Sequence, residues 1–167
     1  MIAVRLVKLA LVASLALFAL LVAYDNVVDY EANYAFVRHT LTMDTTFADS
    51  ALKGRAVTTP ALWAAAYWLI IATQAAVGLL FLAGTVGLAA ALRAPAQRFN
   101  AAKQPVVLGV GLGFLLWFTG FMVIGGEWFA MWQSKAWNGQ ESSFRIYMTL
   151  LAVLIFVNQT DGEMPSG

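Results

Sequence analysis

The 167-residue chain is 61% hydrophobic and only 11% charged. Soluble domains carry about 25% charged residues, so this composition argues against a soluble fold and predicts an integral membrane protein. A net charge of +1 gives no basic surface for nucleic acid, and the absence of cysteine excludes disulfides, zinc–thiolate sites and iron–sulfur clusters.

The first predicted element is a membrane span over residues 2–23. Arg5 and Lys8 precede an uncharged apolar run from Leu9 to Ala23, as expected for a helix that crosses a hydrocarbon core of about 30 Å. A basic start before an apolar run is also typical of a signal peptide, but the small-residue cleavage pattern at the end of this run is poor. We therefore expect a retained helix.

Residues 25–59 form the first predicted loop, which is too long to be a simple turn. Within it Tyr34, Val37 and Leu41 recur at i, i+3 and i+7. This spacing predicts a short helix that lies along the membrane face.

The second and third spans are predicted over residues 61–92 and 106–124. The second begins after Thr59 and Pro60, a pair typical of a helix start, and it contains no charged residue. Both spans carry small residues at helical spacing, which let neighbouring helices approach closely in lipid. The predicted packing positions are Ala72, Ala76, Ala83 and Gly87 in the second span and Gly109, Gly113 and Gly120 in the third.

A fourth span is predicted over residues 144–157. This run is shorter than the usual twenty residues or so, although Arg145 near its start can extend the effective length by reaching toward the interface. The polar residues after Val157 are expected to be frayed.

Charge sets the predicted orientation. Lysine and arginine gather near the N-terminus and between the second and third spans, and these residues favour the cytoplasmic side of a membrane. We therefore expect both termini to be cytoplasmic and the loops at 25–59 and 125–143 to lie together on the outer face. The predicted fold is an all-α, single-domain, four-helix transmembrane bundle whose two outer loops contain short interfacial helices.

The chain resembles domain-of-unknown-function family 2165, a bacterial family described as predicted small integral membrane proteins. The resemblance covers about residues 2–156 and rests on four segments: NVVDY at 26–30, FVRH at 36–39, MDTTF at 43–47 and GGEWFAMW at 125–132. It implies a bacterial inner membrane and a four-helix architecture. It implies no activity, cofactor or catalytic residue.

Two features of the outer loops are candidate ligand sites. His39 is the only histidine, and the alternatives for it are a metal, haem or proton-transfer site and an ordinary loop residue. The alternatives for the loop carboxylates are a calcium site and solvated surface charge; these are Asp25, Asp29, Glu31, Asp44 and Asp49. Because a lone histidine is a weak signal and the carboxylates lack EF-hand spacing, no metal, cofactor or catalytic residue is predicted.

Glu127 follows two glycines at the outer end of the third span. A carboxylate near the membrane needs a partner, and Arg145 at the start of the fourth span is the predicted one. The pair is interpreted as structural, with a proton or ligand site as the alternative.

The outer loop at 125–143 is rich in aromatic residues. Trp128, Phe129, Met131 and Trp132 crowd five positions, and Trp137 follows. Tryptophans at this depth are typical of interfacial anchors, but tryptophan and methionine are also common in partner surfaces. The alternatives are therefore a lipid anchor, a docking patch that includes His39, and a quinone or lipid pocket.

Between their flanking charges the first three spans contain no Asp, Glu, Lys, Arg or His, which argues against an ion pathway or a proton relay. The sequence favours a non-catalytic protein that contacts lipid and other integral membrane subunits, as an accessory or stabilising subunit of a larger bacterial membrane complex, respiratory or transport. The alternative is a small membrane enzyme or a protein that binds a lipophile, quinone or haem at the outer face.

Overall fold

The computed structural model describes residues 2–163, and all regular structure in that range is helical. The long helices are α1 (Ile2–Val28), α3 (Pro60–Ala90), α5 (Gln104–Phe114) with its continuation η2 (Leu115–Trp128), and α6 (Gln140–Val157). The shorter ones are α2 (Tyr30–Thr42), η1 (Ala51–Arg55), α4 (Ala96–Ala101) and η3 (Met131–Gln133).

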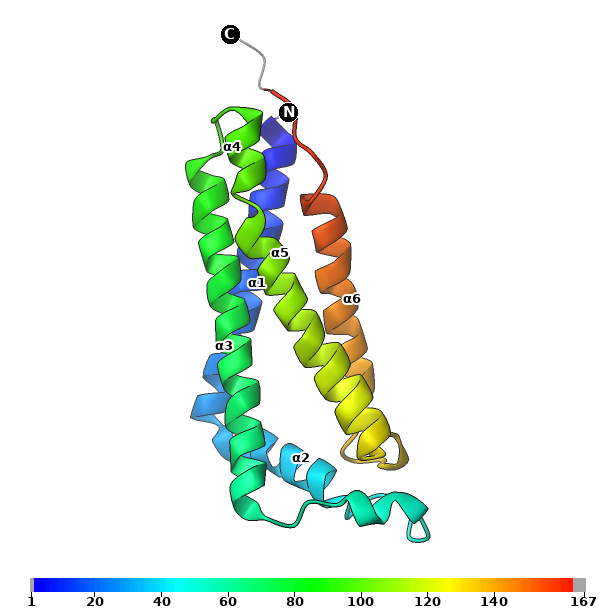
Figure 1. Ribbon diagram of the computed structural model, residues 1–167. Coiled ribbons are helices and arrows are strands. Elements are labelled where there is room, and N and C mark those ends of the chain that lie inside the picture. Colours follow the sequence, from blue (N-terminus) through cyan, green and yellow to red (C-terminus); the bar gives the residue numbers. More distant parts are fainter. Residues whose placement is uncertain (1, 164–167) are drawn as a thin grey trace.

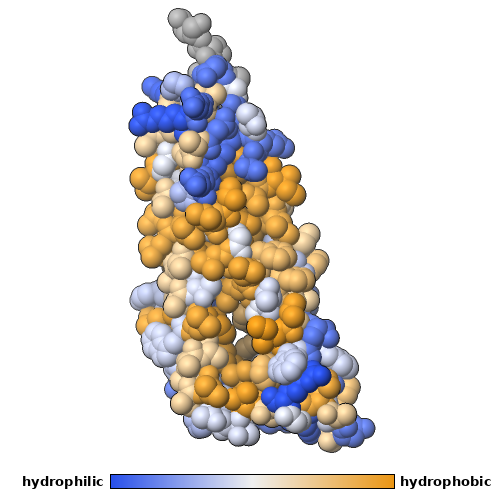
Figure 2. Space-filling model, in the orientation of Figure 1, coloured by the Kyte–Doolittle hydropathy of each residue, from blue (hydrophilic) through white to orange (hydrophobic). Residues whose placement is uncertain are grey.

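Four long helices run along one axis and form an elongated bundle (Figure 1). Within residues 2–163, four segments are long and apolar enough to cross a membrane: Ile2–Val28, Pro60–Ala90, Ala96–Trp128 and Gln140–Val157. On the face shown in Figure 2, hydrophobic side chains cover the middle of the molecule and hydrophilic ones gather toward its two ends. The predicted all-α, four-helix transmembrane fold is confirmed.

The two ends of the bundle differ. At one, here called the terminal end, the N-terminal turns of α1 meet α4 and residues 158–163, here called the strap (Figure 1). At the other, the loop end, α2 lies across the bundle axis (Figure 1), and the connecting loops contain η1 and η3. The predicted interfacial helix in the first loop is α2, and its residue Val37 packs against Tyr67 and Ile71 of α3.

Close packing around α3 depends on two glycines. A Cβ atom at Gly78 would lie 2.7 Å from the side chain of Leu20 in α1, and one at Gly84 would lie 2.6 Å from Val106 in α5. These contacts leave no room for a methyl group, so α1 and α5 approach the backbone of α3 there. In lipid, such packing replaces the hydrophobic driving force that holds soluble bundles together.

The predicted small-residue stripe on α3 requires a correction. Ala72 and Ala83 are exposed, and Ala76 and Gly87 are only partly buried. The buried face instead follows a helical stripe through Tyr67, Ile71, Gln74, Val77, Gly78, Phe81, Gly84 and Leu88. One step along a helix rotates the side chain by about 100°, which is enough to turn the predicted positions away from α1 and α5.

The glycines of the third span divide into two groups. Gly109 and Gly113 are close-packing positions, because added Cβ atoms would lie 2.8 Å from the ring of Phe81 and 2.6 Å from Leu150 respectively. A Cβ atom added at Gly120 would have no neighbour nearer than 3.9 Å, and this glycine lies beside a cavity described below.

The third span changes character at Leu115. From there to Trp128 the helix is a π-helix, and it ends with a bond from the amide of Phe129 to the carbonyl of Ile124, five residues back. π-Helical turns are rare and occur frequently at functional sites because they widen the helix and shift its side chains. The segment with the unusual backbone is the one that leads into the aromatic loop.

Candidate functional site

The loops at 25–59 and 125–143 meet at the loop end and form one unit, here called the loop cap. The hydroxyl of Thr45 donates to the hydroxyl of Ser134 at 2.9 Å, and the amide of Phe47 donates to the side-chain oxygen of Gln133 at 3.1 Å. These contacts join residues 89 and 86 positions apart in the chain. The cap is therefore a tertiary structure rather than two independent connectors.

A small apolar core lies within the loop cap and joins its two loops. Met43, Phe129 and Ala130 are buried together. Met43 and Ala130 have left-handed backbone angles, with φ of 54° and 50°, which non-glycine residues rarely adopt. Such conformations are stabilised by surrounding contacts, so this core holds two strained turns in place.

His39 joins the two loops. Its Nε2 lies 3.1 Å from the guanidinium of Arg38 and its Nδ1 lies 2.8 Å from the carboxylate of Asp44. Because a guanidinium only donates, Nε2 accepts and the Nδ1 proton points to Asp44. The ring stacks on Trp137, with centroids 4.7 Å apart and planes 15° from parallel.

Metal-ligating residues do not gather in this region. Within residues 2–163, no three histidine, cysteine or carboxylate residues lie close enough to hold a metal ion. Both nitrogens of the His39 ring have protein partners.

Three exposed aromatic residues lie on the loop cap, here called the aromatic patch: Phe47, Trp128 and Trp132. Each is about half exposed, at 51%, 54% and 48% respectively. Phe47 and Trp132, from different loops, meet edge to face at 5.8 Å. Arg55 lies 4.6 Å above the ring of Trp128 and donates to its carbonyl at 3.2 Å.

The structure divides the residues that the sequence grouped as a docking patch. Trp128 and Trp132 are exposed, and Trp137 is partly buried beneath His39. Phe129 and Met131 are buried, with exposed fractions of 7% and 2%. Only the tryptophans offer surface to a partner, and the other two residues support them from within.

The predicted Glu127–Arg145 ion pair requires a correction. Arg145 pairs with Glu141, one turn earlier on α6, and both side chains are exposed. A partner four residues away on the same helix is within reach whatever the rest of the fold does, which explains the difference. Glu127 instead borders a shallow surface pocket together with Arg55 and Trp128.

A cavity of about 380 Å³ lies directly beneath the loop cap. Its walls come from α2, α3 and the third span from Leu112 to Gly125, with Phe129 and Met131 closing the side toward the cap. All of the lining residues that the structure describes are uncharged. Figure 2 shows a hollow framed by hydrophobic side chains toward the loop end of the molecule.

A polar network buried between α1 and α3 lies at the same end of the bundle. Asn26 donates to the side-chain oxygen of Gln74 at 2.7 Å and accepts from Asn33 at 2.7 Å. The hydroxyl of Tyr67 donates to the backbone carbonyl of Asn26 at 3.1 Å. Each buried polar group thus has a partner, as lipid-embedded helices require.

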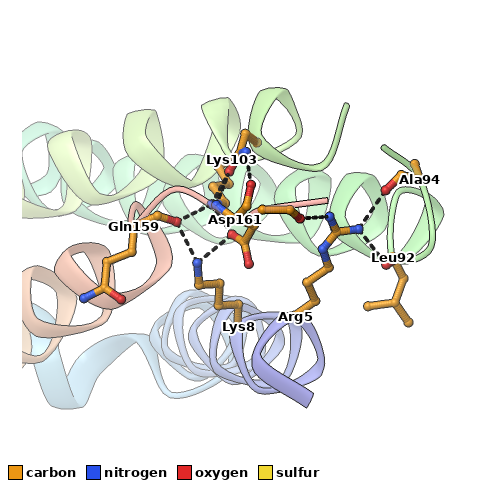
Figure 3. Close-up of polar contacts among 9 residues, drawn as sticks. Arg5, Lys8, Leu92, Ala94, Lys103, Gln159 and Asp161 are labelled. Atoms are coloured by element: carbon orange, nitrogen blue, oxygen red, sulfur yellow. Dashed lines mark hydrogen bonds and ion pairs between the residues drawn. The ribbon is translucent and has the colours of Figure 1, made fainter. Parts of the chain in front are cut away.

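The terminal end holds a cluster of buried charges. The carboxylate of Asp161 in the strap accepts from Lys8 at 2.6 Å and from Lys103 at 2.5 Å (Figure 3). Both lysines also donate to the carbonyl of Gln159 at 2.7 Å. Three segments far apart in sequence are therefore joined by one carboxylate and one carbonyl.

Charge pairing sets the protonation state of Asp161. Burial by itself raises the pKa of this carboxyl group, but the hydrogen bonds from Lys103 and Lys8 outweigh burial and hold the pKa below its ordinary value. The group is consequently ionised in the folded protein at neutral pH.

Arg5 completes the terminal cluster. Its guanidinium donates to the carbonyls of Leu92 and Ala94, just beyond the C-terminal end of α3, and to Gly162 of the strap (Figure 3). A cation at a helix C-terminus is stabilised by the unpaired carbonyls there. Arg5 is only 1% exposed, so its role is internal.

This cluster corrects the expectation that the polar residues after Val157 are frayed: residues 158–163 are bonded to α1 and to Lys103. One signal was present: Arg5 and Lys8 are three residues apart and so share a face of α1. The cavity and the π-helix had no comparable signal beyond the glycines at 120, 125 and 126.

The four apolar helices, the apolar middle of the surface and the polar ends define a small integral membrane protein. A family model described as predicted small integral membrane protein (DUF2165) matches residues 4–160. The chain belongs to this family, which confirms the resemblance noted in the sequence. Searches of curated proteins and of solved structures found no match.

Proposed function

We propose that this protein is a non-catalytic accessory subunit that docks onto a larger membrane complex through the aromatic patch of its loop cap. The observation that carries the proposal is the rigid presentation of Phe47, Trp128 and Trp132. Each of these side chains is about half exposed, and hydrogen bonds between the two loops hold them in place. Tryptophan and arginine are enriched among the residues that dominate binding energy at interfaces, and Arg55 lies on the same surface.

The rigidity of the patch distinguishes it from a simple lipid anchor. An interfacial tryptophan needs only to reach the headgroup layer, which a flexible loop allows. Here the edge-to-face contact of Phe47 with Trp132 and the stack of Arg55 on Trp128 fix the ring orientations. Fixed orientation reduces the entropy lost on binding a protein partner, and a fluid lipid surface has no need of it.

We further propose that the host membrane is a bacterial inner membrane, with both termini in the cytoplasm and the loop cap on the outer face. The support is the concentration of basic residues at the terminal end, which favours the cytoplasmic side. These residues are Arg5, Lys8, Arg93, Arg98 and Lys103.

The orientation has a direct test because the chain contains no cysteine. Single cysteines replace Asp49 in the first loop and Gln97 in α4, both exposed positions. A membrane-impermeant maleimide added to intact spheroplasts should label the first variant and spare the second. Labelling of the Gln97 variant alone would overturn the orientation.

Docking is tested by extracting the protein from its native membrane in lipid nanodiscs and measuring the size of the particle on a native gel. Wild-type protein should migrate with a larger complex, and Trp132→Ala should weaken that association by about thirtyfold, as expected for loss of a central aromatic anchor. Trp68→Ala is the matched control, since Trp68 is 51% exposed but lies on α3 outside the patch.

The control variant should remain in the complex, and both variants should keep the thermal stability of the wild type. Migration of the wild-type protein as a monomer would contradict docking. Equal loss of association in both variants would contradict the assignment of the patch.

A further inference from the structure

We propose that the cavity beneath the loop cap is a binding site for one acyl chain of a membrane glycerolipid. The proposal is independent of docking by the aromatic patch. It rests on the volume, lining and opening of the cavity.

The volume and lining fit a hydrocarbon chain. At about 380 Å³ the cavity falls within the range of about 300–1,000 Å³ typical of small-molecule sites. Its walls are leucine, isoleucine, phenylalanine, alanine, methionine, valine, glycine and threonine, with no charge among the described lining residues. A phosphate or carboxylate inside would be unpaired in an apolar medium, so the part of the ligand that enters must be uncharged.

The cavity opens toward lipid. Leu69 on α3 and Leu115 on η2 both line it, yet these side chains are 68% and 58% exposed. The mouth therefore lies between two membrane-spanning segments, at the surface that bilayer lipids cover. An acyl chain can enter from the side without leaving the hydrocarbon layer.

The cavity lining offers little to a polar ligand. Its polar side chains are those of Thr40, Thr73 and Thr119. The hydroxyl of Thr73 is already bonded to the carbonyl of Leu69 at 2.7 Å, and the Thr40 Oγ1 atom is enclosed by protein atoms. A hydrocarbon chain needs no hydrogen-bond partner, so it suits this lining.

The position of the cavity fits a chain of a glycerolipid. The cavity lies beside α2, which runs across the bundle axis at the loop end, where the spans reach the polar layer. The headgroups of bilayer lipids occupy this layer. The charged headgroup of a bound lipid therefore stays outside while its chain extends into the apolar cavity.

The π-helix explains how the space arises. Gly120 and Gly125 of η2 line the cavity, and the backbone there has the wider π-helical turn. A Cβ atom at Gly120 would have no neighbour nearer than 3.9 Å. A larger side chain at this position therefore has room to occupy the cavity instead of disturbing the helix packing.

The experiment uses vesicles of phosphatidylcholine and phosphatidylglycerol that contain a phosphatidylcholine with a diazirine in one acyl chain. After irradiation, labelled residues are mapped by mass spectrometry. The informative residue is Met131, which lines the cavity but is only 2% exposed, so a chain reaches it only through the cavity. Labelling of Leu79, which is 58% exposed, measures ordinary bilayer contact.

Wild-type protein should be labelled at both Met131 and Leu79. Gly120→Leu should reduce labelling of Met131 about tenfold relative to Leu79, because the new side chain fills the cavity. Gly111→Leu is the matched control: Gly111 is exposed, has no neighbour within 4 Å of an added Cβ and does not line the cavity. It should leave the ratio unchanged.

The melting temperature of each variant is measured beside its labelling, and both variants should melt close to the wild type. Absence of label at Met131 in wild-type protein would overturn the proposal, as would equal labelling in the Gly120 and Gly111 variants. Recovery of one bound quinone per chain, with Met131 unlabelled by phospholipid, would assign the cavity to a different occupant and overturn it too.

Discussion

The terminal end and the loop end close the same bundle by different means. At the terminal end, Lys8, Lys103 and Asp161 are buried and bonded to one another across three segments. At the loop end, two strained turns and a histidine–tryptophan stack hold a cap that exposes aromatic rings above a cavity. The comparison shows that buried ionic bonds join the segments at one end, while the other end exposes aromatic side chains above a cavity.

The largest expected effect comes from opening the terminal end. Asp161→Ala leaves two lysines buried without their carboxylate, and breaking a buried ion pair costs about 3–5 kcal/mol. The melting temperature in detergent or nanodiscs should fall accordingly, and the strap should become sensitive to protease. Glu163→Gln is the control, because Glu163 lies in the same strap but is exposed, and its change should be small.

The same carboxyl group makes the terminal end sensitive to acid. Its pKa is lower in the folded protein than in the unfolded chain, where it is about 3.9, so the unfolded state binds the proton more readily. The stabilisation is fully present above about pH 5 and is lost as pH falls through the folded pKa. The difference in melting temperature between wild type and Asp161→Asn should therefore shrink on acidification below about pH 4; a constant difference would contradict the assigned ionisation.

A smaller effect is expected where the spans pack between the two ends. An added methyl at Gly109 would lie 2.8 Å from the ring of Phe81, and overpacking of this kind costs about 1–3 kcal/mol. Gly109→Ala should lower the melting temperature, whereas Gly111→Ala, with no neighbour within 4 Å, should not. Equal effects at the two glycines would show that helix propensity matters more here than packing.

The smallest effect is expected in the polar network of the loop end. Gln74→Leu removes the partner of the Asn26 amide, and hydrogen bonds between membrane helices contribute about 1 kcal/mol. The melting temperature should fall slightly, while Thr85→Val on the same helix serves as control, because its hydroxyl bonds only to its own helix at the carbonyl of Phe81. A loss as large as that of Asp161→Ala would contradict the contrast between the two ends.

The sequence predicted the architecture well because hydropathy and length determine how many helices cross a membrane. It also located α2, whose apolar spacing is local. It failed where contacts are distant in the chain: Asp161 bonds Lys8 from 153 residues away, and no local pattern signals that pairing. The Glu127–Arg145 prediction failed for the opposite reason, since Glu141 offered Arg145 a nearer partner on its own helix.

The packing stripe on α3 shows a further limit of sequence reasoning. The predicted set of residues and the buried set both repeat at helical spacing along α3. Gly78 and Gly84 belong to the buried set, which faces α1 and α5. Small side chains mark positions where helices can approach, but the shapes of the facing helices decide which set is used. The cavity and the π-helix likewise depend on how whole segments meet.

The central claim is that the loop end, through its aromatic patch, is the surface that meets a protein partner. The most direct measurement places a photoreactive phenylalanine analogue at Phe47 on the patch or at Arg98 on the terminal end, both exposed, and irradiates intact native membranes. We expect a discrete protein adduct from position 47 that disappears when Trp132→Ala is added, and none from position 98. Adducts of equal yield from both ends, or an adduct at position 47 that is unaffected by Trp132→Ala, would contradict the account.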